Sequence, residues 1–434
     1  MALPATIRPL HRPSPTALRL FVLAAATFTF VTTETQPIAL LEPMARGLHE
    51  SEATIGLLMT AYAALAALTA IPLTIFASRI PRRPLVLATV IILTVSQAAF
   101  AVAPSYGVVL AARLVGALAH GVFWSVIAQV AASLVSRDRV GRATAAVFAG
   151  NSVALVAGTP LVSALGAVLG WRAAVACMGV AAALTVVAMW RVLPAIGSGE
   201  AKLHRRAILT DALRRPRLLV VCAVTLLVAF GQFVAFTYLA PIVRTHTGLT
   251  GTGLSAVLLA YGAAGVAGVA AVGVITDRRP RVALIGCCAA VVAALALIAA
   301  VPHSTPVMVL GALGWGAGFT ALPICLQGAV LRVAGRIPDT ASALYVVAFQ
   351  IGIGGGALLG AAMLGAGELG SIPTVALVLI AAGSAIALAS GQTFAREPYA
   401  ARPGRPGRRR RDQFCSPRAT AKQASQRGQG GFQG

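Results

Sequence analysis

VALIGCCAAVVAALALIAAV, residues 282–301, runs for twenty positions without a charged or amide side chain. A helix of that length rises about 30 Å, which is the thickness of the hydrocarbon core of a bilayer. Similar blocks recur along the chain, so that 58% of its 434 residues are hydrophobic and only 11% are charged. A soluble globular protein carries about 25% charged residues. The composition therefore predicts an all-α membrane protein.

Twelve such apolar blocks follow one another along the chain. They predict transmembrane helices at 19–41, 54–77, 84–103, 106–133, 143–168, 172–193, 218–243, 254–275, 282–301, 305–331, 340–364 and 371–391. Short turns rich in Arg, Pro and Gly separate them, as at 79–83 and 277–281, because such residues end helices and cannot stay in the bilayer centre. The alternating strands of a membrane barrel are not seen in the sequence.

The loops between these helices alternate in charge. Lys and Arg gather before the first helix and after every even-numbered one, with six between Lys202 and Arg217. Because cytoplasmic loops carry the excess of positive charge, we expect both termini in the cytoplasm and the protein in the cell (plasma or inner) membrane. Most of the net charge of +23 lies in these loops and the tail, so it does not indicate a nucleic-acid partner.

The chain also contains an internal duplication. A shift of 199 residues places Tyr62 on Tyr261, Arg79 on Arg278, Arg82 on Arg281 and Asn151 on Gln350. This predicts a cytoplasmic segment at 1–18, a six-helix half at 19–193, a cytoplasmic linker at 194–217, a second six-helix half at 218–391 and a basic disordered tail at 392–434. Repeats of this kind place a substrate site between the halves near the midplane and let one half rock against the other.

Several motifs resemble the major facilitator superfamily. The turn Gly273-Val-Ile-Thr-Asp277-Arg278-Arg-Pro-Arg281 resembles its loop signature Gly-x-x-x-Asp-Arg-x-x-Arg, and Gly158-Thr-Pro160 resembles the glycine-proline motif of its proton antiporters. Thr32-Thr33-Glu34, Ala119-His120 and Gln350-Ile-Gly352 resemble the sugar efflux branch of the drug:proton antiporters. The resemblance covers roughly 19–391 and implies gating roles for Arg79, Arg82, Gly158, Pro160, Gly273, Asp277, Arg278 and Arg281. In the first-half copy of the loop, Ser78 takes the place of the acidic residue.

Glu34 is the only acidic residue well inside a predicted helix. A lone carboxylate in hydrocarbon costs several kcal/mol unless it is paired, hydrated or protonated. Arg113 in the fourth predicted helix lies at a similar depth and could pair with it. We therefore expect Glu34 and Arg113 to couple transport to protons, with a static ion pair that fixes helix packing as the alternative.

Other polar and aromatic residues of the predicted helices are candidates for substrate contact. Amides and imidazoles in lipid need hydrogen-bond partners, which a substrate or a neighbouring helix can supply. The candidates are His120, Trp124, Asn151, Gln232, Tyr238, Gln327 and Gln350. Packing is the alternative role for each of them, and Pro160 is expected to kink the fifth helix.

The sequence favours a carrier over other membrane proteins. A phosphate-binding G-x-x-x-x-G-K-[ST] loop is excluded, because neither of the two lysines, Lys202 and Lys422, follows a glycine. The scattered histidines and cysteines lack metal-ligand spacing, so no metal, cofactor or enzymatic activity is expected. We expect a monomeric, proton-coupled exporter of small organic molecules, with sugars or sugar analogues as the leading substrates. A multidrug or antibiotic exporter and a membrane sensor that binds ligand without moving it are the alternatives.

Overall fold

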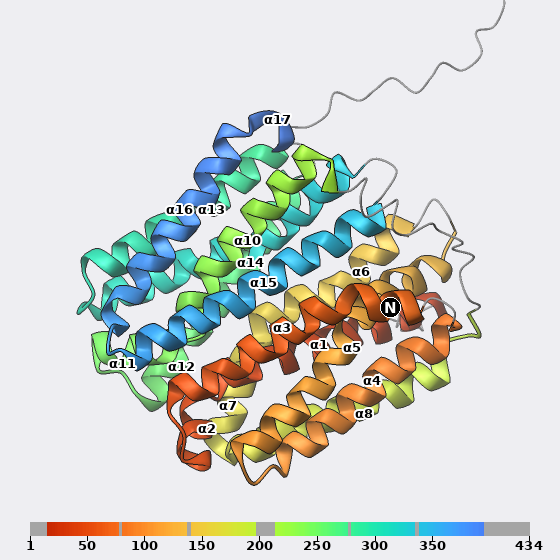
Figure 1. The fold of residues 1–434 in the computed structure, drawn as a ribbon, viewed down its shortest axis with the longest axis horizontal. Helices are drawn as coiled ribbons and strands as arrows, with labels where there is room; N and C mark the ends of the chain where they lie inside the picture. The colour runs from red at the N-terminus through yellow and green to blue at the C-terminus, as the bar shows by residue number, and fades with distance from the viewer. Residues whose placement is uncertain are drawn as a thin grey trace, which may run out of the picture. The chain divides into compact units, whose positions relative to one another are not determined.

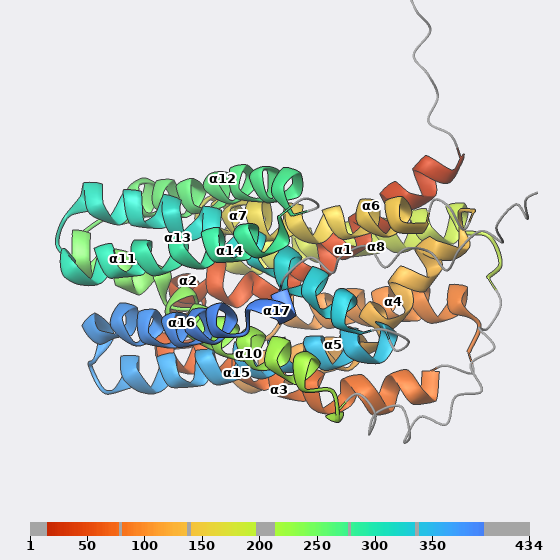
Figure 2. The ribbon, with the colours of Figure 1, turned by 90° about the horizontal axis from the view of Figure 1, so that it is seen from above.

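The computed structural model describes residues 15–77, 80–136, 140–196, 213–276, 279–334 and 338–394. These residues form long helices that lie side by side in a bundle (Figures 1 and 2). Of the regions expected from the sequence, most of the linker and nearly all of the basic tail lie outside the described residues. Arg79, Asp277 and Arg278 lie outside them as well.

The first half of the chain supplies six membrane crossings. Its elements are α1 (Pro15–Ala39), α2 (Leu41–Leu48), α3 (Glu52–Ala77), α4 (Arg82–Ala101), α5 (Tyr106–Ser133), α6 (Val140–Val153), the π-helical turn η2 (Ala154–Gly158), α7 (Thr159–Leu169) and α8 (Trp171–Val192). The segment α6, η2 and α7 corresponds to the single helix expected at 143–168.

The second half repeats this order. Its elements are α10 (Pro216–Phe236), α11 (Leu239–Thr247), α12 (Gly251–Ile275), α13 (Pro280–Ala300), α14 (Thr305–Val333), α15 (Pro338–Gly365), the short η3 (Leu369–Ser371), α16 (Ile372–Ala389) and α17 (Gly391–Phe394). The short helix α11 follows α10 as α2 follows α1, so the duplication extends to this helix break, whereas α15 is continuous where the first half is interrupted by η2.

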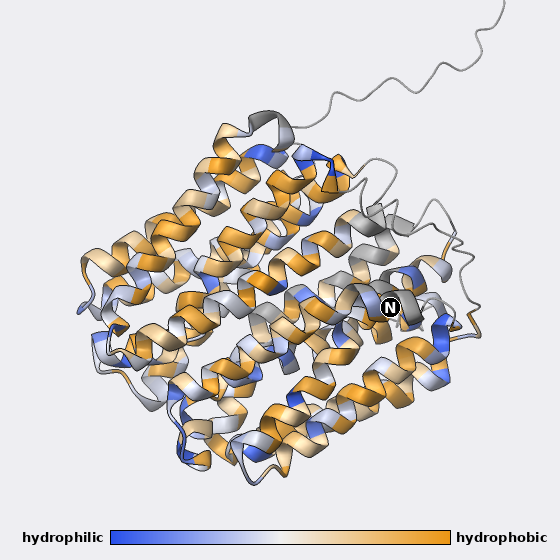
Figure 3. Ribbon diagram, in the orientation of Figure 1, coloured by the Kyte–Doolittle hydropathy of each residue, from blue (hydrophilic) through white to orange (hydrophobic). Residues whose placement is uncertain are grey.

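The prediction of an all-α fold with twelve crossings is confirmed. Among the described residues, eleven helices are long and apolar enough to cross a membrane, and the interrupted α6–α7 segment supplies the twelfth crossing. Large apolar side chains are exposed on the bundle, for example Val168 at 82% and Val274 at 77%. Hydrophobic residues dominate the helix lengths, while many hydrophilic ones lie near helix ends (Figure 3). This surface suits lipid.

The fifth crossing is interrupted just before Pro160. A proline inside a helix removes the hydrogen bond to the carbonyl four residues earlier, and its ring crowds that carbonyl. Here the five residues of η2 form a widened π-helical turn, and Pro160 then lies in the first turn of α7, where a missing N–H is tolerated. A methyl group at Gly158 would lie 2.5 Å from the Thr32 hydroxyl, so glycine lets η2 approach α1 closely.

The two halves meet along α3 and α15, and along α12 with η2 and α7. Small residues make the first contact close: the Thr60 hydroxyl donates to the Gly354 carbonyl over 3.0 Å, and a methyl group at Gly354 would lie 3.2 Å from the Ala63 Cβ. Small residues are the usual means by which membrane helices approach one another. This arrangement brings the middle of α15 within reach of the middle of α5 and of Glu34 in α1.

Candidate functional site

Glu34 lies in α1 and is the only buried carboxylate among the described residues, with 7% of its surface exposed. Gln350 in α15 donates from Nε2 to Glu34 Oε1 over 3.1 Å. His120 in α5 faces the other carboxylate oxygen, with Nδ1 3.9 Å from Oε2. Residues from both halves of the chain therefore surround this carboxylate.

Gln350 also contacts His120 directly. Its Nε2 lies 2.6 Å from His120 Nε2, while the other imidazole nitrogen, Nδ1, lies 3.2 Å from the Tyr62 hydroxyl. All three side chains are buried. We call Glu34, Tyr62, Arg113, His120 and Gln350 the proton cluster, after the role that we propose for Glu34. It unites four of the residues singled out in the sequence with Tyr62, for which the repeat position shared with Tyr261 was the only signal.

Arg113 does not form the expected pair with the Glu34 carboxylate. Its NH1 donates to the Thr33 carbonyl over 2.7 Å and its NH2 to the Glu34 carbonyl over 2.9 Å. The reason lies in Pro37, which has no N–H to offer the Thr33 carbonyl four residues earlier in α1. The forked guanidinium supplies that missing donor, and its carbon lies 4.6 Å from the centre of the Tyr62 ring.

Aromatic rings form one wall of the proton cluster. Phe30 stacks on Phe123 at 4.1 Å between ring centres, and the half-buried Trp124 meets Phe123 edge to face at 5.4 Å. The Trp124 ring centre is 6.2 Å from that of His120. Trp124, a candidate for substrate contact from the sequence, thus lies beside the titratable groups.

A second polar cluster lies in the other half. Gln232 in α10 donates to the Tyr261 hydroxyl over 3.0 Å and accepts from Trp315 Nε1 over 2.5 Å. Both atoms of this buried amide are therefore engaged within the protein. This contact is of the packing kind that was the alternative to substrate binding.

The remaining substrate candidates are dispersed. Tyr238 is fully buried and donates to the Ala357 carbonyl over 3.1 Å, where Gly56 of the first half leaves room for its ring. Gln327 is half-buried and donates to Ser342 over 3.0 Å. Asn151 is half-buried in α6, with no hydrogen bond to another described side chain. The structure joins none of these three to the proton cluster.

Arginines at the start of α4 and α13 hold helix ends together. Arg83 donates to the Trp190 carbonyl over 2.6 Å, and Arg281 donates to the Leu388 carbonyl over 3.3 Å. Each arginine reaches 107 residues along the chain, so the two contacts are similar, although they are offset by one position from the 199-residue shift. Arg82, the residue singled out in the sequence, begins α4, and its neighbour makes the contact. Gly273 is exposed near the end of α12.

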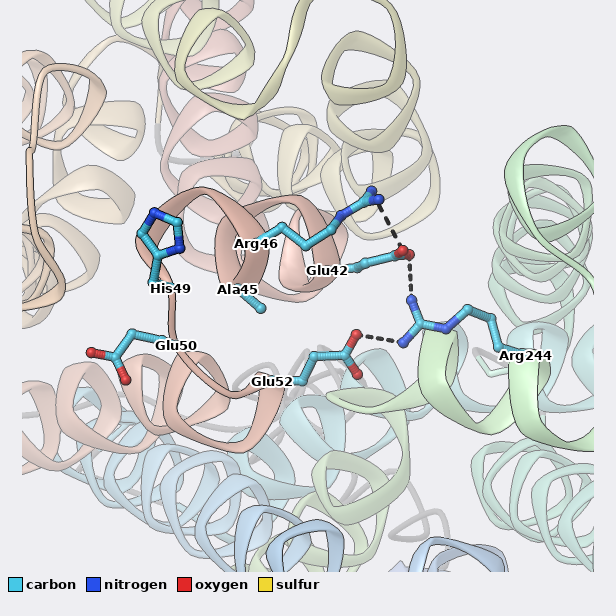
Figure 4. A pocket seen from close by; sticks show the side chains of 7 residues that line it. All are labelled: Glu42, Ala45, Arg46, His49, Glu50, Glu52 and Arg244. Atoms are coloured by element: carbon cyan, nitrogen blue, oxygen red, sulfur yellow. Dashed lines mark hydrogen bonds and ion pairs between the residues drawn. The ribbon is translucent and has the colours of Figure 1, made fainter.

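An ion-pair clamp joins the halves at the end of the bundle that holds α2 and α11, which we call the α11 end. Arg244 of α11 lies between Glu42 of α2 and Glu52 of α3 and pairs with both, while Arg46 reaches Glu42 over 3.4 Å (Figure 4). These side chains line a shallow hollow of about 520 Å³ with His49 and Glu50.

The two glutamates that pair with Arg244, Glu42 and Glu52, stabilise its positive charge. Burial by itself lowers the pKa of a guanidinium, but the hydrogen bond and the charge of Glu52, with the charge of Glu42, outweigh it and raise the pKa of Arg244 above its ordinary value. Arg244 therefore stays positive over the whole working pH range, and the clamp persists as long as its two glutamates are ionised.

Known proteins resemble this chain over most of its length. A protein of Mycobacterium tuberculosis strain H37Rv named a chloramphenicol efflux pump is 39% identical over 79% of this chain and 85% of its own. A probable sugar efflux transporter of Helicobacter pylori strain 26695 is 31% identical over 82% and 91%.

Solved structures share the fold. A bacterial homologue of the human lysosomal transporter Spinster gives a TM-score of 0.66 at 15% identity, covering 88% of this chain and 98% of its own. A POT family transporter in complex with 5-aminolevulinic acid gives a TM-score of 0.71 at 12% identity, covering 86% and 96%.

A family profile fixes the assignment. Residues 21–357 match the profile of the Major Facilitator Superfamily, and this span takes in the proton cluster, the α11 end and the motifs quoted from the sequence. Members of this family move small molecules across membranes and are not enzymes. The chain belongs to the Major Facilitator Superfamily and is a multi-span membrane transporter.

Proposed function

We propose that this transporter exports small neutral organic molecules in exchange for protons, with Glu34 as the group that carries the proton. One observation supports it above the others: the buried carboxylate of Glu34 contacts His120 of its own half and Gln350 of the other. A carboxylate in that position changes the contact between the halves when it gains or loses charge, which is what coupling requires.

Several polar candidates for substrate contact are already hydrogen-bonded within the protein, and this favours an amphipathic ligand over a sugar. Gln232, Tyr238 and Trp315 hydrogen-bond within the protein, so they offer a polyhydroxy ligand little. Near the proton cluster, the half-buried Trp124 offers an aromatic face. A neutral aromatic alcohol of the chloramphenicol kind matches this mixture, and the relative at 39% identity carries that name.

Sugar export is the second candidate, supported by the 31% identical relatives named for it. Dicationic dyes are disfavoured, because a lipophilic dication would need a second carboxylate and Glu34 is the only buried one among the described residues. The substrates are therefore ranked as neutral aromatic alcohols, then neutral sugars, then dications.

The orientation follows from the basic loops. We place both termini in the cytoplasm and the α11 end outside, in the bacterial inner membrane, with the chain acting as a monomer. Reporter fusions at Arg82 and Lys202 should then read as cytoplasmic, and fusions at Glu50 and Glu368 as external. An internal signal at Glu368 would overturn this orientation.

Everted vesicles with an imposed pH gradient test the coupling. Wild-type vesicles should accumulate radiolabelled chloramphenicol against its gradient. Glu34→Gln should lose that accumulation yet still exchange chloramphenicol down a gradient, because an amide cannot titrate. Glu368→Gln, at an exposed carboxylate, is the matched control and should behave as wild type. Proton-driven accumulation by Glu34→Gln at the wild-type rate would exclude Glu34 as the coupling group.

The same vesicles rank the substrates. Chloramphenicol should be accumulated more strongly than a neutral sugar, and a dicationic dye least. Trp124→Ala should weaken chloramphenicol transport more than residual sugar transport, because the indole face serves the aromatic ring. A preference for sugars over chloramphenicol would reverse the ranking and leave proton coupling untouched.

A further inference from the structure

The amide nitrogen of Gln350 joins the second half of the chain to Glu34 and His120 of the first half. Gln350 Nε2 lies 3.1 Å from Glu34 Oε1 and 2.6 Å from His120 Nε2. Gln350 belongs to α15, whereas Glu34 and His120 belong to α1 and α5 of the first half. A change in the protonation of Glu34 or His120 therefore directly alters a hydrogen bond of Gln350.

The hydrogen-bond chemistry of the amide restricts their protonation states. A primary amide nitrogen has two protons to donate and cannot accept. Both contacts from Nε2 therefore require acceptors, namely the carboxylate oxygen of Glu34 and the lone pair on His120 Nε2. The imidazole proton then lies on Nδ1, where the Tyr62 hydroxyl can accept it over 3.2 Å.

Protonation of His120 breaks the hydrogen bond that it accepts from Gln350. An imidazole nitrogen has one lone pair, so a proton on His120 Nε2 points at the amide protons and expels them. The amide can then turn and offer its oxygen, but that oxygen would face Glu34 Oε1 and be repelled unless the carboxyl group is protonated too. The two titrations are thus linked through one side chain.

The amide oxygen supports the same reading. Gln350 is only 3% exposed, and its Oε1 has no hydrogen-bond partner among the described residues. A buried acceptor left unpaired disfavours the state that leaves it so. Turning the amide toward a protonated His120 would give this oxygen a donor.

The charged and titratable groups around the amide come from three helices. Glu34 faces it from α1 and His120 from α5, with Arg113 of α5 and Tyr62 of α3 behind them. The neighbouring turn of α15 packs on Ala229 and Phe230 of α10, which do not titrate.

We propose that Gln350 is a positioning residue that holds α15 against α1 and α5 only while Glu34 and His120 are both unprotonated. Proton binding in the first half then releases or turns the amide and frees the second half to move. This inference rests on the proposed function, in which Glu34 binds the transported proton.

The fluorescence of Trp124 can report the event, because a protonated imidazole quenches a nearby indole and the two ring centres are 6.2 Å apart. We would titrate purified protein in nanodiscs and subtract the signal of the same protein carrying Trp124→Phe. The midpoint of the difference should move up by about half to one pH unit in Gln350→Met, because the lost donor favoured the unprotonated groups.

Two further variants complete the test. Gln350→Glu presents an acceptor to His120 and should move the midpoint further in the same direction, which also covers the case in which Gln350→Met fails to fold. Gln97→Met is the matched control: it removes the buried amide that donates to Gln36 over 3.0 Å within the first half, and its midpoint should equal that of wild type. Midpoints for both Gln350 variants within about 0.2 pH unit of wild type would overturn the inference.

The outcome is separable from the proposed function. Unshifted midpoints, together with loss of proton-driven accumulation in Glu34→Gln, would contradict the role of Gln350 and still support proton coupling through Glu34. Wild-type accumulation by Glu34→Gln would instead overturn the coupling itself, whatever the Gln350 variants show.

Discussion

The two halves share a scaffold and differ in charge at its centre. Tyr62 and Tyr261 are buried at equivalent positions 199 residues apart. Tyr62 lies under Arg113 and beside His120, whereas Tyr261 accepts a hydrogen bond from Gln232 and meets Trp315 edge to face. Tyr62 therefore belongs to a cluster with charged side chains, and Tyr261 belongs to a neutral cluster.

The same shift shows what replaced the charges. It places Glu34, Arg113 and His120 on Phe233, Ala312 and Phe319. Phe233 and Phe319 contact each other edge to face with ring centres 6.4 Å apart, where their counterparts are a carboxylate and an imidazole. Among the described residues the buried charges at the centre belong to the first half, which agrees with our proposal that this half binds the proton and the second half responds.

The largest effect is expected when Arg113 is replaced by alanine, the residue at the equivalent position of the second half, Ala312. Arg113→Ala leaves the Thr33 carbonyl without its donor, at about 1–3 kcal/mol for a buried unpaired group, and removes the guanidinium from the Glu34 carbonyl. Chloramphenicol accumulation in vesicles should fall by about a hundredfold, and Arg113→Lys should not restore it because an ammonium lacks the fork. Wild-type accumulation by Arg113→Ala would show that Arg113 has no part in holding α1.

The matched change in the second half should cost stability and leave pH dependence alone. Gln232→Leu strands the Trp315 N–H, and the melting temperature in detergent should fall accordingly, with a loss of about 1–3 kcal/mol. The pH profile of transport should keep its wild-type midpoint, since neither Gln232 nor Trp315 titrates in the working range. A displaced midpoint would mean that the neutral cluster takes part in coupling.

The clamp at the α11 end should give a smaller effect. Its partly exposed ion pairs are worth about 0.2–1 kcal/mol each, so Arg244→Gln should favour separation of the halves there by several-fold. A cysteine at Ile55, buried in wild type, should then react several-fold faster with an impermeant maleimide.

Raising the pH to about 10 should not mimic Arg244→Gln, because the partners of Arg244 raise its pKa and keep it charged. Arg46→Gln, at the other arginine that pairs with Glu42 but does not bridge the halves, is the control. Equal labelling of Ile55→Cys in both backgrounds would mean that Arg244 does not hold the halves together.

The smallest effect concerns α11, the second-half counterpart of α2. Burial first, and then the charge of His303, lower the pKa of His246, although the Pro302 backbone partly opposes them. Below the ordinary value of about 6.5, the unfolded chain binds a proton that the folded chain resists, so stability should fall as the pH drops from 7 to 5.

His246→Phe keeps a ring beside His303, with which His246 stacks at 5.8 Å, and should flatten that dependence of the melting temperature. His49→Phe, at an exposed histidine of the same end, should leave the wild-type slope. A slope unchanged by His246→Phe would assign the acid sensitivity to other groups.

The sequence predicted the relative depth of Glu34 and Arg113 correctly, but it did not predict which groups these side chains contact. Rise per residue correctly placed Glu34 and Arg113 at one level, but depth does not say which atom a long side chain reaches. Pro37 opened a nearer acceptor on the main chain, and Arg113 took it. Gln232 was a candidate for substrate contact because amides need partners in lipid, and Tyr238 because its ring could stack on a substrate. Both side chains hydrogen-bond within the protein instead.

The sequence by itself determined the membrane setting, the twelve crossings, the duplication and the presence of an acidic residue, Glu34, inside a membrane helix. Each of these follows from local composition or from spacing along the chain, because lipid tolerates only long apolar helices and penalises a lone charge. Only the tertiary structure decided that Gln350 joins Glu34 to His120, that Tyr62 belongs to the cluster and that Arg244 clamps the halves. These contacts join residues up to 316 positions apart. Their existence depends on how each helix is rotated about its axis, which packing sets and hydrophobicity does not.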